Sequence, residues 1–344
     1  MSENVEALLG FQELKGMGEF WLLLSPLRKE RKMRNQTTIM EFIIKGFSDT
    51  EEFQMLYFFV FLLIYIITVL GNLLIILLTC ITPKLHTPMY FFLNNLSFID
   101  VCYTSTTVPK ILATLLTNQR TISYVGCVTQ LYLVVSFAAT ESCLLASMAY
   151  DRYVAICIPL RYAIIMHKKV YILLTVASWI ISSLYSIVHT VNTFRLPFCG
   201  SNVVNHFFCE IPPLLKIACA NTYINELLVF ALGGFLFLGG FLLIAISYVF
   251  IISSILNITS KEGRNKSFST CVSHLIVVTL FYGSGSFMYM QPTSRYSMTQ
   301  ARLMAVFYTI VTPMLNPIIY SLRNKEIKGA FRKLISRNEF THRM

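Results

Sequence analysis

Long apolar stretches alternate with short polar segments along most of the chain. Windows of about 20 apolar residues, the length that an α-helix needs to cross the hydrocarbon core of a bilayer, recur seven times. We expect the spanning helices near residues 54–80, 88–112, 125–150, 171–191, 226–255, 270–290 and 301–322. The pattern therefore predicts an all-α membrane protein, folded as a seven-transmembrane helix bundle.

The segment after the last window has a different pattern. Within residues 321–335, the apolar residues Ile327, Ala330, Phe331 and Leu334 recur at helical spacing, with basic residues between them. A helix of this kind lies in the membrane surface, with its apolar face towards the lipid. We therefore expect a short amphipathic C-terminal helix on the inner surface of the membrane.

We expect no signal peptide before the first window, because the apolar run at residues 20–32 is followed by positive charges rather than preceded by them. We expect three regions. They are an extracellular tail (1–53), the seven-helix domain (54–322) and a cytoplasmic helix and tail (323–344).

Composition agrees with the membrane class: 55% of the residues are hydrophobic and 13% are charged, whereas soluble domains carry about 25% charged residues. In a soluble protein the net charge of +11 would suggest a nucleic-acid partner. In a membrane protein the positions of the charges report orientation instead. We therefore expect membrane lipid, and no nucleic acid, as a partner.

Basic residues concentrate in one set of loops. Placing the N-terminus outside puts these residues in the inner segments: Lys84, Arg152, Arg161, Lys168, Lys169, Lys261, Arg264, Lys266, Arg323, Lys325, Lys328, Arg332, Lys333 and Arg337. The outer segments hold fewer: Lys110, Arg120, Arg195, Lys216, Arg295 and Arg302. Because Lys and Arg near short loops stay on the cytoplasmic side, this predicts an extracellular N-terminus and a cytoplasmic C-terminus. A glycosylation sequon at Asn35 agrees.

Each of the first three predicted spans holds a polar side chain that stands out: Asn72 in the first, Asp100 in the second and Glu141 in the third. Ionisable groups are expensive in lipid, so each is a candidate functional residue. Two facing carboxylates can hold a Na⁺ ion or share one proton. The alternative is that all three only hydrogen-bond neighbouring helices. Both interpretations require side chains that face the interior of the bundle.

Two further motifs lie near the predicted inner boundary. In TPMLNPIIY, Pro313 and Pro317 each remove a backbone hydrogen bond, so this helix contains either an architectural kink or a movable joint. In MAYDRYVAICIPLRY, residues 148–162, Arg152 follows Asp151 at the end of an apolar window. Such an arginine is either a membrane-boundary residue or part of a latch that breaks when helices move.

Several stretches together resemble the olfactory receptors of the tetrapod type, which are rhodopsin-like G-protein-coupled receptors. They are GN (71–72), PKLHTPMYFFLNNLSFIDVCY (83–103), MAYDRYVAICIPLRY (148–162), SY (247–248), KSFSTCVSHL (266–275) and PMLNPIIYSLRN (313–324). The resemblance covers residues 34–337, and PMYFFL and MAYDRYVAIC are the most specific parts. Residues 1–32 have no counterpart in the family and represent either an upstream gene-model extension or an extracellular tail.

Departures from other rhodopsin-like receptors strengthen this resemblance. Residues 279–289 read TLFYGSGSFMY where most such receptors have Cys-Trp-x-Pro, and the fifth window contains no proline. Both features are typical of olfactory receptors. Arg161 in place of the usual His, and Ser267 in place of the Ala of KAFSTC, are mild departures from the olfactory pattern.

The resemblance assigns roles to residues near the inner face. Arg152, restrained by Asp151 at rest, would be released to meet Tyr248 and a stimulatory olfactory-type G protein, which raises cyclic AMP. The same switch would include Tyr153, Lys266, Ser267, Asn316, Pro317 and Tyr320. Asp100 and Glu141 would form a Na⁺ site, and no other cofactor is expected.

The resemblance also implies two disulfides, Cys127–Cys209 and Cys199–Cys219, although spacing alone allows three pairings of four cysteines. It implies a receptor rather than an enzyme, in the plasma membrane of olfactory cilia. The expected ligand is a small volatile odorant.

The implied ligand site lies between the outer halves of the helices. Its expected residues are Leu131, Val134, Val135, Ala138, Ala139, Leu232, Leu236, Gly285, Ser286, Tyr289, Val306 and Thr309. None carries a charge, so we expect a neutral, hydrophobic ligand. The alternative for each residue is plain helix packing.

Two other functional classes fit the sequence less well. A transporter or channel would also carry intramembrane carboxylates, but the odd number of spans and the lack of inverted repeats argue against it. An intramembrane enzyme is disfavoured because neither HExxH nor GxSxG occurs.

Overall fold

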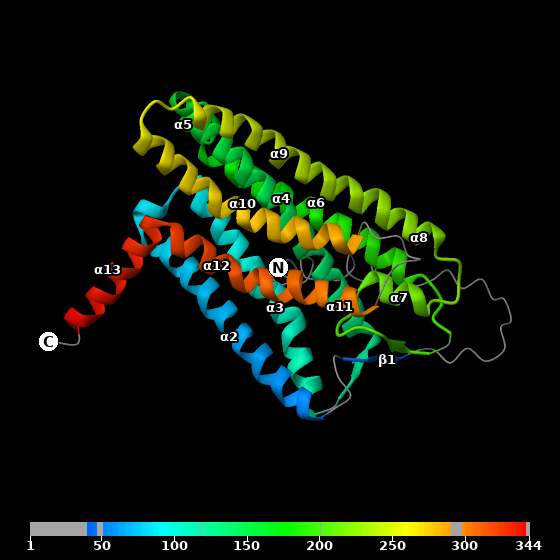
Figure 1. The fold of residues 1–344 in the computed structure, drawn as a ribbon. Helices are drawn as coiled ribbons and strands as arrows, with labels where there is room; N and C mark the ends of the chain where they lie inside the picture. Colours follow the sequence, from blue (N-terminus) through cyan, green and yellow to red (C-terminus); the bar gives the residue numbers. More distant parts are fainter. Residues whose placement is uncertain (1–39, 47–50, 118, 200, 290–297, 342–344) are drawn as a thin grey trace, which may run out of the picture.

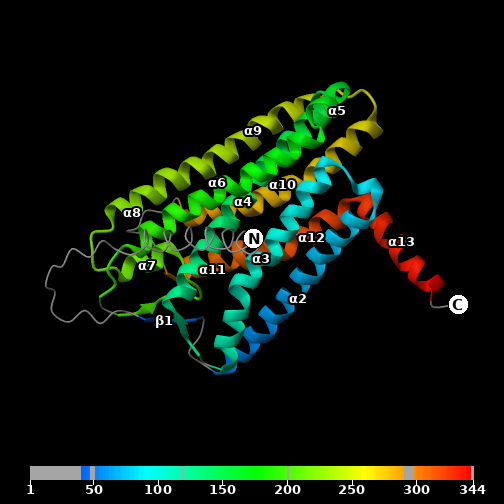
Figure 2. The ribbon, with the colours of Figure 1, turned by 180° about the vertical axis from the view of Figure 1, so that it is seen from behind.

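A computed structural model describes residues 40–46, 51–117, 119–199, 201–289 and 298–341. Long helices run side by side as one bundle (Figures 1 and 2). Their bounds are α2 Glu51–Ile81, α3 Pro88–Thr117, α4 Tyr124–Cys157, α6 Lys168–Phe194, α8 Tyr223–Leu228, α9 Gly234–Leu256, α10 Lys261–Tyr289, α11 Met298–Val306 and α12 Thr312–Arg323. A π-helical turn at Val229–Gly233 joins α8 to α9, and another at Phe307–Val311 joins α11 to α12. The predicted seven-helix bundle is therefore confirmed.

Six helical segments of the described chain are long and apolar enough to cross a membrane by length and composition. The seventh, α3, has 30 residues but carries Asn94, Asn95, Asp100 and Lys110 among its apolar side chains. Its polar positions include the intramembrane carboxylate predicted from the sequence. Low hydropathy in α3 therefore reflects side chains that face protein rather than lipid.

Helix α4 is the central element of the bundle. In its most apolar window 61% of the residues are buried, against 22% for α2 and 17% for the α8–α9 segment. It contacts α3, α6, α9 and α10. Side chains on most of its faces therefore contact protein, which suits a helix that carries both Glu141 and Asp151.

A small sheet closes the end of the bundle opposite to the C-terminal helix (Figure 1). Strand β1 (Glu41–Ile44) lies between β2 (Thr121–Ser123), to which it is antiparallel, and β3 (Val203–Val204), to which it is parallel. Phe42 and Ile44 of β1 are buried against the start of α4. The hydrophobic pattern did not predict this sheet, since its strands are only two to four residues long.

The remaining short elements lie in the loops. They are the 3-10 turns Pro83–Leu85 and Pro159–Arg161, α5 (Tyr162–Ile165) and α7 (Ile211–Ile217). At the other end, α13 (Lys325–Thr341) projects away from the bundle. Its residues Ile327 and Ala330 are buried, while Phe331 is 40% exposed. The expected amphipathic helix is present, and it uses part of its apolar face to pack on the bundle.

Two predicted features lie outside the described residues. Asn35, the predicted glycosylation site, belongs to the N-terminal segment before residue 40, as do residues 1–32. The side chains of Lys266 and Tyr289 also lie outside the description, although both residues belong to α10.

Candidate functional site

The intramembrane polar residues converge in the middle of the bundle. Asp100 on α3, Glu141 on α4 and Asn316 on α12 are at most 1% exposed. The Asn316 amide donates to both Asp100 carboxylate oxygens, at 3.0 and 3.2 Å. This arrangement ties α12 to α3 through a carboxylate that lies far from water.

Asn72 satisfies a backbone group that a proline leaves free. Pro317 has no N–H, so the carbonyl of Pro313, four residues earlier, loses its helical partner. The Asn72 Nδ2 donates to this carbonyl at 3.1 Å, and also to the Thr68 carbonyl at 3.0 Å. Asn72 therefore stabilises the proline-containing helix α12 from α2, the structural role weighed for it from the sequence.

Gly71, the neighbour of Asn72, lets the two helices approach. A Cβ at this position would lie 3.0 Å from the Pro317 ring. Contact between α2 and α12 is therefore close enough for the Asn72 amide to reach the backbone of α12.

Glu141 differs from Asp100 in having unsatisfied oxygens. Both Glu141 carboxylate oxygens are buried, and neither forms a hydrogen bond of normal geometry with a described residue, although the Asn316 side chain lies close enough to interact with this carboxylate. The two carboxylates also interact electrostatically. A buried carboxylate without partners is costly unless a proton or a cation neutralises it. Carboxylate and amide oxygens together suit a small hard cation such as Na⁺, so the residues fit the ion that the resemblance implied.

In the arginine switch region, Asp151 interacts with Tyr162 as well as with Arg152. Asp151 is buried, and its Oδ1 accepts a hydrogen bond of 2.8 Å from the Tyr162 hydroxyl. Arg152 interacts with Asp151 electrostatically, while its Nε is buried without a hydrogen-bond partner among the described residues. Burial and the neighbouring Asp151 raise the pKa of Tyr162, so this hydroxyl keeps its proton and donates. Tyr162 ends the MAYDRYVAICIPLRY motif, yet the sequence reasoning gave it no role.

Tyr248 on α9 is held by a histidine that the sequence reasoning also missed. The Tyr248 hydroxyl lies 2.9 Å from Nδ1 of His274, and Nε2 of His274 lies 3.1 Å from the Leu145 carbonyl. A carbonyl only accepts, so the neutral ring donates from Nε2 and accepts from Tyr248 at Nδ1. His274 therefore links α9, α10 and α4 in the inner half of the bundle.

The other predicted switch residues occupy the same region. Tyr153 packs edge-on against Phe250, with ring centroids 5.9 Å apart. Tyr320 is buried, and Ser267 on α10 is half-buried. The switch residues thus lie on α4, α9, α10 and α12, the elements that meet around His274 and Asp100.

The candidate ligand residues come from α4, α9, α10 and the α11–α12 segment. Leu131, Val134, Ala139, Gly285 and Thr309 are buried, and Val135, Ala138, Leu236, Ser286 and Val306 are half-buried. Leu232 is 38% exposed. None of them lines the cavity between α2, α12 and α13 or the shallow cavity on α10. Their placement is consistent with a closely packed site as well as with helix packing.

Contacts between α4, α9 and α10 add residues that the sequence reasoning missed. The Ser142 and Tyr282 hydroxyls lie 2.9 Å apart, joining α4 to α10. The ring of Phe237 on α9 packs at a tilt against the Tyr282 ring, with centroids 4.7 Å apart. It also lies over Gly285, where a Cβ would be 2.7 Å from a Phe237 ring carbon. Gly285 is thus required for the close approach of Phe237 to α10.

Two disulfides fix the outer loop. Cys127 at the start of α4 bonds to Cys209, and Cys199 bonds to Cys219 within the loop itself. These are the pairs that the resemblance implied. The first bond also places residues 203–211 over the outer end of the bundle, where Cys209 packs with Leu131.

A buried polar cluster joins this loop to the α11–α12 segment. The His206 Nε2 and the Glu210 Oε2 are 3.3 Å apart, and both side chains are about 95% buried or more. The Tyr308 hydroxyl donates to the other Glu210 oxygen, and Arg302 donates to Asn205. Residues at the outer end of α11 and the following turn therefore hold the loop through polar contacts.

Burial sets the ionisation of this cluster. It raises the pKa of Glu210 to about 7, an effect that the hydrogen bond from Tyr308 partly offsets. Burial, together with the positive charge of Arg302, lowers the pKa of His206 to about 3. Glu210 follows Cys209 directly in HFFCE, and an acidic residue in so apolar a stretch was the available signal for this cluster.

Comparison with solved structures supports the class of the protein. Squid rhodopsin superposes with a TM-score of 0.67 at 19% sequence identity, over 85% of this chain and 88% of that chain. The helix bundle thus has the seven-helix fold of squid rhodopsin.

Sequence comparison identifies the family. Residues 61–338 match the family described as olfactory receptor. Mouse "Olfactory receptor 5AR1" is 51% identical over 303 residues, covering 88% of this chain and 98% of the mouse protein. Human "Olfactory receptor 5B12" is 50% identical over 305 residues, covering 89% and 97%. The chain belongs to the olfactory receptor family.

Family membership decides between the classes weighed from the sequence. The protein is a multi-pass membrane receptor of the odorant-sensing class, with an odorant and a G protein as its general partners. It is neither an enzyme nor a transporter. The resemblance inferred from the motifs is confirmed.

Proposed function

We propose that this receptor binds a small, neutral, hydrophobic volatile ligand and couples to a stimulatory olfactory-type heterotrimeric G protein, raising cyclic AMP. The observation that supports the ligand class is the lining of the candidate site, which holds no charged side chain. Of the two buried carboxyls near this region, Glu210 already has Tyr308 and His206 beside it. The other, Glu141, two residues after Ala139, belongs to the cation site proposed below. A ligand charge would therefore lose its hydration without gaining a partner.

The hydrogen bonds between α4 and α10 suggest how binding reaches the inner face. Ser142–Tyr282 lies beside the candidate ligand residues, and His274–Leu145 lies closer to the arginine switch. A ligand that packs better when α10 is displaced stabilises that minor conformation. Displacement of α10 alters the His274 contacts with Tyr248 and Leu145, which frees Tyr248 to meet Arg152.

The same displacement changes the surroundings of Arg152. Tyr162 holds Asp151 at rest, and the buried Arg152 Nε has no hydrogen-bond partner among the described residues. An arginine whose Nε has no partner can donate new hydrogen bonds, here to Tyr248 and the G protein. Replacing Arg152 is therefore expected to abolish signalling without preventing folding.

The test is cyclic AMP accumulation in cells that express residues 33–344 with the stimulatory olfactory-type G protein. We expect neutral alcohols, esters, ketones or aldehydes to activate the receptor. Arg152→Ala is expected to abolish the response at equal surface expression, whereas Lys169→Gln, an exposed inner-face change, leaves it intact. Activation by a carboxylate but not by its neutral analogues contradicts the proposed ligand class.

We also propose that Asp100, Glu141 and Asn316 hold Na⁺ in the resting receptor, with a structural role only as the alternative. The unsatisfied Glu141 oxygens support this proposal. Added NaCl, compared with choline chloride at equal ionic strength, is expected to raise the Tm of the purified receptor. Asp100→Asn is expected to remove this sodium effect, and a difference that persists in the variant argues against the site.

The proposed location is the plasma membrane, in cilia of olfactory sensory neurons, with the N-terminus outside and the C-terminus inside. The supporting observation is the charge bias of the loops. Accessibility of an epitope tag placed before residue 40 to antibody on intact cells tests this orientation, and staining only after permeabilisation contradicts it.

A further inference from the structure

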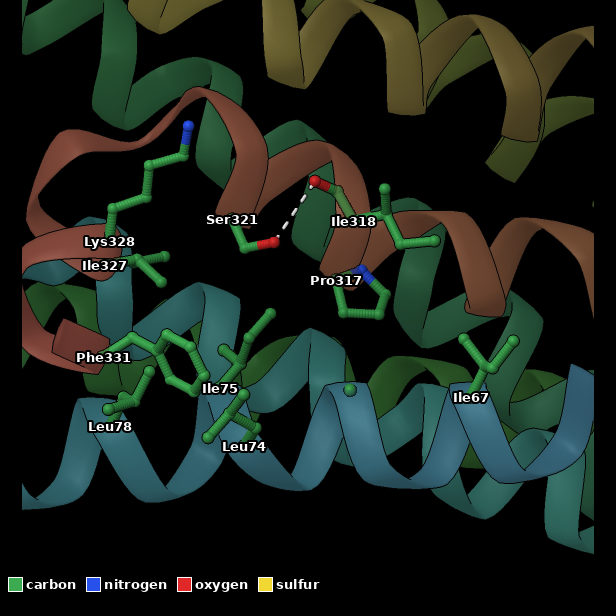
Figure 3. A pocket seen from close by; sticks show the side chains of 11 residues that line it. Ile67, Leu74, Ile75, Leu78, Pro317, Ile318, Ser321, Ile327, Lys328 and Phe331 are labelled. Atoms are coloured by element: carbon green, nitrogen blue, oxygen red, sulfur yellow. Dashed lines mark hydrogen bonds between the residues drawn. The ribbon is translucent and has the colours of Figure 1, made fainter. Parts of the chain in front are cut away.

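A groove lies between α2, α12 and α13, away from the ligand and switch residues. Its volume is about 300 Å³. The side chains that line it are mainly aliphatic and aromatic: Ile67, Leu74, Ile75, Leu78, Ile327 and Phe331 (Figure 3). Gly71 and Pro317 also line it, at the place where α2 and α12 come close together.

The groove has the length and depth of an acyl-chain site. Figure 3 shows Ile67 at one end and Leu78 with Phe331 at the other. Eleven residues of helix separate Ile67 from Leu78, which corresponds to about 16 Å. Ile67 lies near the middle of α2, and Leu78 lies near the end that the charge pattern places inside. The groove therefore extends from the centre of the bilayer to its inner surface.

The two polar side chains that line the groove, Ser321 and Lys328, do not need a polar partner in its apolar part. The Ser321 hydroxyl donates to the Ile318 carbonyl at 3.3 Å. The remaining polar side chain is Lys328, whose stem lines the groove while its ammonium points away from the apolar side chains of α2 (Figure 3). The groove thus combines an apolar channel with one cation at its inner end.

The surroundings of Lys328 are basic. Arg332 lies one turn further along α13, and Lys84 lies in the turn Pro83–Leu85 that packs against α13. The acidic residue on this side, Glu326, accepts a hydrogen bond from Tyr90 at 3.1 Å. Basic pockets beside membrane helices on the cytoplasmic side attract anionic headgroups.

We propose that this groove binds one anionic glycerophospholipid of the inner leaflet, with an acyl chain between α2 and α12 and the phosphate at Lys328. We choose this occupant because the groove reaches the inner surface of the membrane, has an apolar lining and ends at the positive charge of Lys328. A neutral sterol would leave the basic end unused, and a second receptor chain would bring like charge to it. The inference is independent of the odorant site.

The experiment uses the full-length receptor in nanodiscs that contain phosphatidylserine with a photoactivatable acyl chain. Cross-linked peptides are quantified by mass spectrometry. We expect labelling of residues 67–78 and 317–331. Lys328→Gln is expected to lower it about fivefold, the effect of one lysine near an anionic surface. The matched control Lys169→Gln removes an exposed inner-face charge at the start of α6 and leaves labelling unchanged.

A second pair of variants tests the acyl-chain channel. Leu74→Trp fills the groove and is expected to abolish labelling, whereas Leu73→Trp, on the neighbouring 47% exposed position, does not. Three results overturn the proposal. They are equal labelling by a phosphatidylcholine probe, loss of labelling on adding sterol, and cross-links in the groove that join two receptor chains.

Discussion

His206 and Glu210 form a buried pair. We predict that removing either residue makes the stability of the receptor depend on pH, with opposite signs for the two variants. Burial raises the pKa of Glu210 from 4.5 to about 7. This group therefore stabilises the folded state fully below pH 4.5, and the contribution is lost as the pH rises through 7. Burial and Arg302 lower the pKa of His206 from 6.5 to about 3. Its contribution is present above pH 6.5 and is lost as the pH falls towards 3.

The two effects cancel where they overlap. Between pH 5 and 6.5, each group changes the free energy of unfolding by about 1.36 kcal/mol per pH unit, with opposite signs. Wild-type stability is therefore expected to be flat in this range as far as this pair is concerned. Glu210→Gln leaves the His206 effect alone, so stability should rise by about 2 kcal/mol from pH 5 to 6.5. His206→Gln leaves the Glu210 effect alone, so it should fall by about 2 kcal/mol.

Thermal unfolding of the purified receptor measures this effect. Cys271 is a buried free cysteine, whereas Cys80 is exposed. Once Cys80 has been blocked in the folded receptor, further reaction with a fluorogenic maleimide reports unfolding at each pH. A change of about 2 kcal/mol corresponds to a few degrees in Tm. Each variant is compared with itself across pH, which cancels the cost of the substitution. Parallel curves for the wild type and both variants would refute the assigned protonation states.

Three further predictions concern other contacts. Gly285→Ala places a methyl group against Phe237. We therefore expect a loss of about 1–3 kcal/mol of stability and weaker responses to bulky odorants. An unchanged Tm and dose–response curve would contradict this prediction. Cys127→Ser removes a disulfide that closes a loop of 82 residues, which costs about 4–5 kcal/mol of stability. Flow cytometry should therefore show little receptor at the cell surface. Normal surface levels would be inconsistent with this prediction. Tyr162→Phe removes the hydrogen bond to Asp151, and basal cyclic AMP should rise at matched expression; no rise would argue against a restraining role.

The hydrophobic pattern predicts the helices well because each must satisfy its backbone in lipid with its own residues. All seven predicted windows lie within or close to observed helical segments, and the main errors are ends that extend further, such as α4 to Cys157. Loop structure is less predictable. The strands of the outer sheet pair residues from three distant segments, which no local periodicity reveals.

Motifs identify the site residues better than they identify their partners. The sequence marks Asp151 and Tyr248 as candidates, but the hydrogen bonds to Tyr162 and His274 depend on how helices pack. Glu210 is a similar case. Its neighbours His206 and Tyr308 come together only when the disulfide has placed the loop against the π-helical turn Phe307–Val311.

The outer sheet imposes an order of events during biosynthesis. Strand β1 is made first, but its partners β2 and β3 follow about 80 and 160 residues later, after several helices have entered the membrane. The bond between Cys127 and Cys209 waits for the same late segment. Until then Phe42 and Ile44 have no complete surface to pack against. The end of the bundle that carries the sheet is therefore the last part of the receptor that can complete its fold.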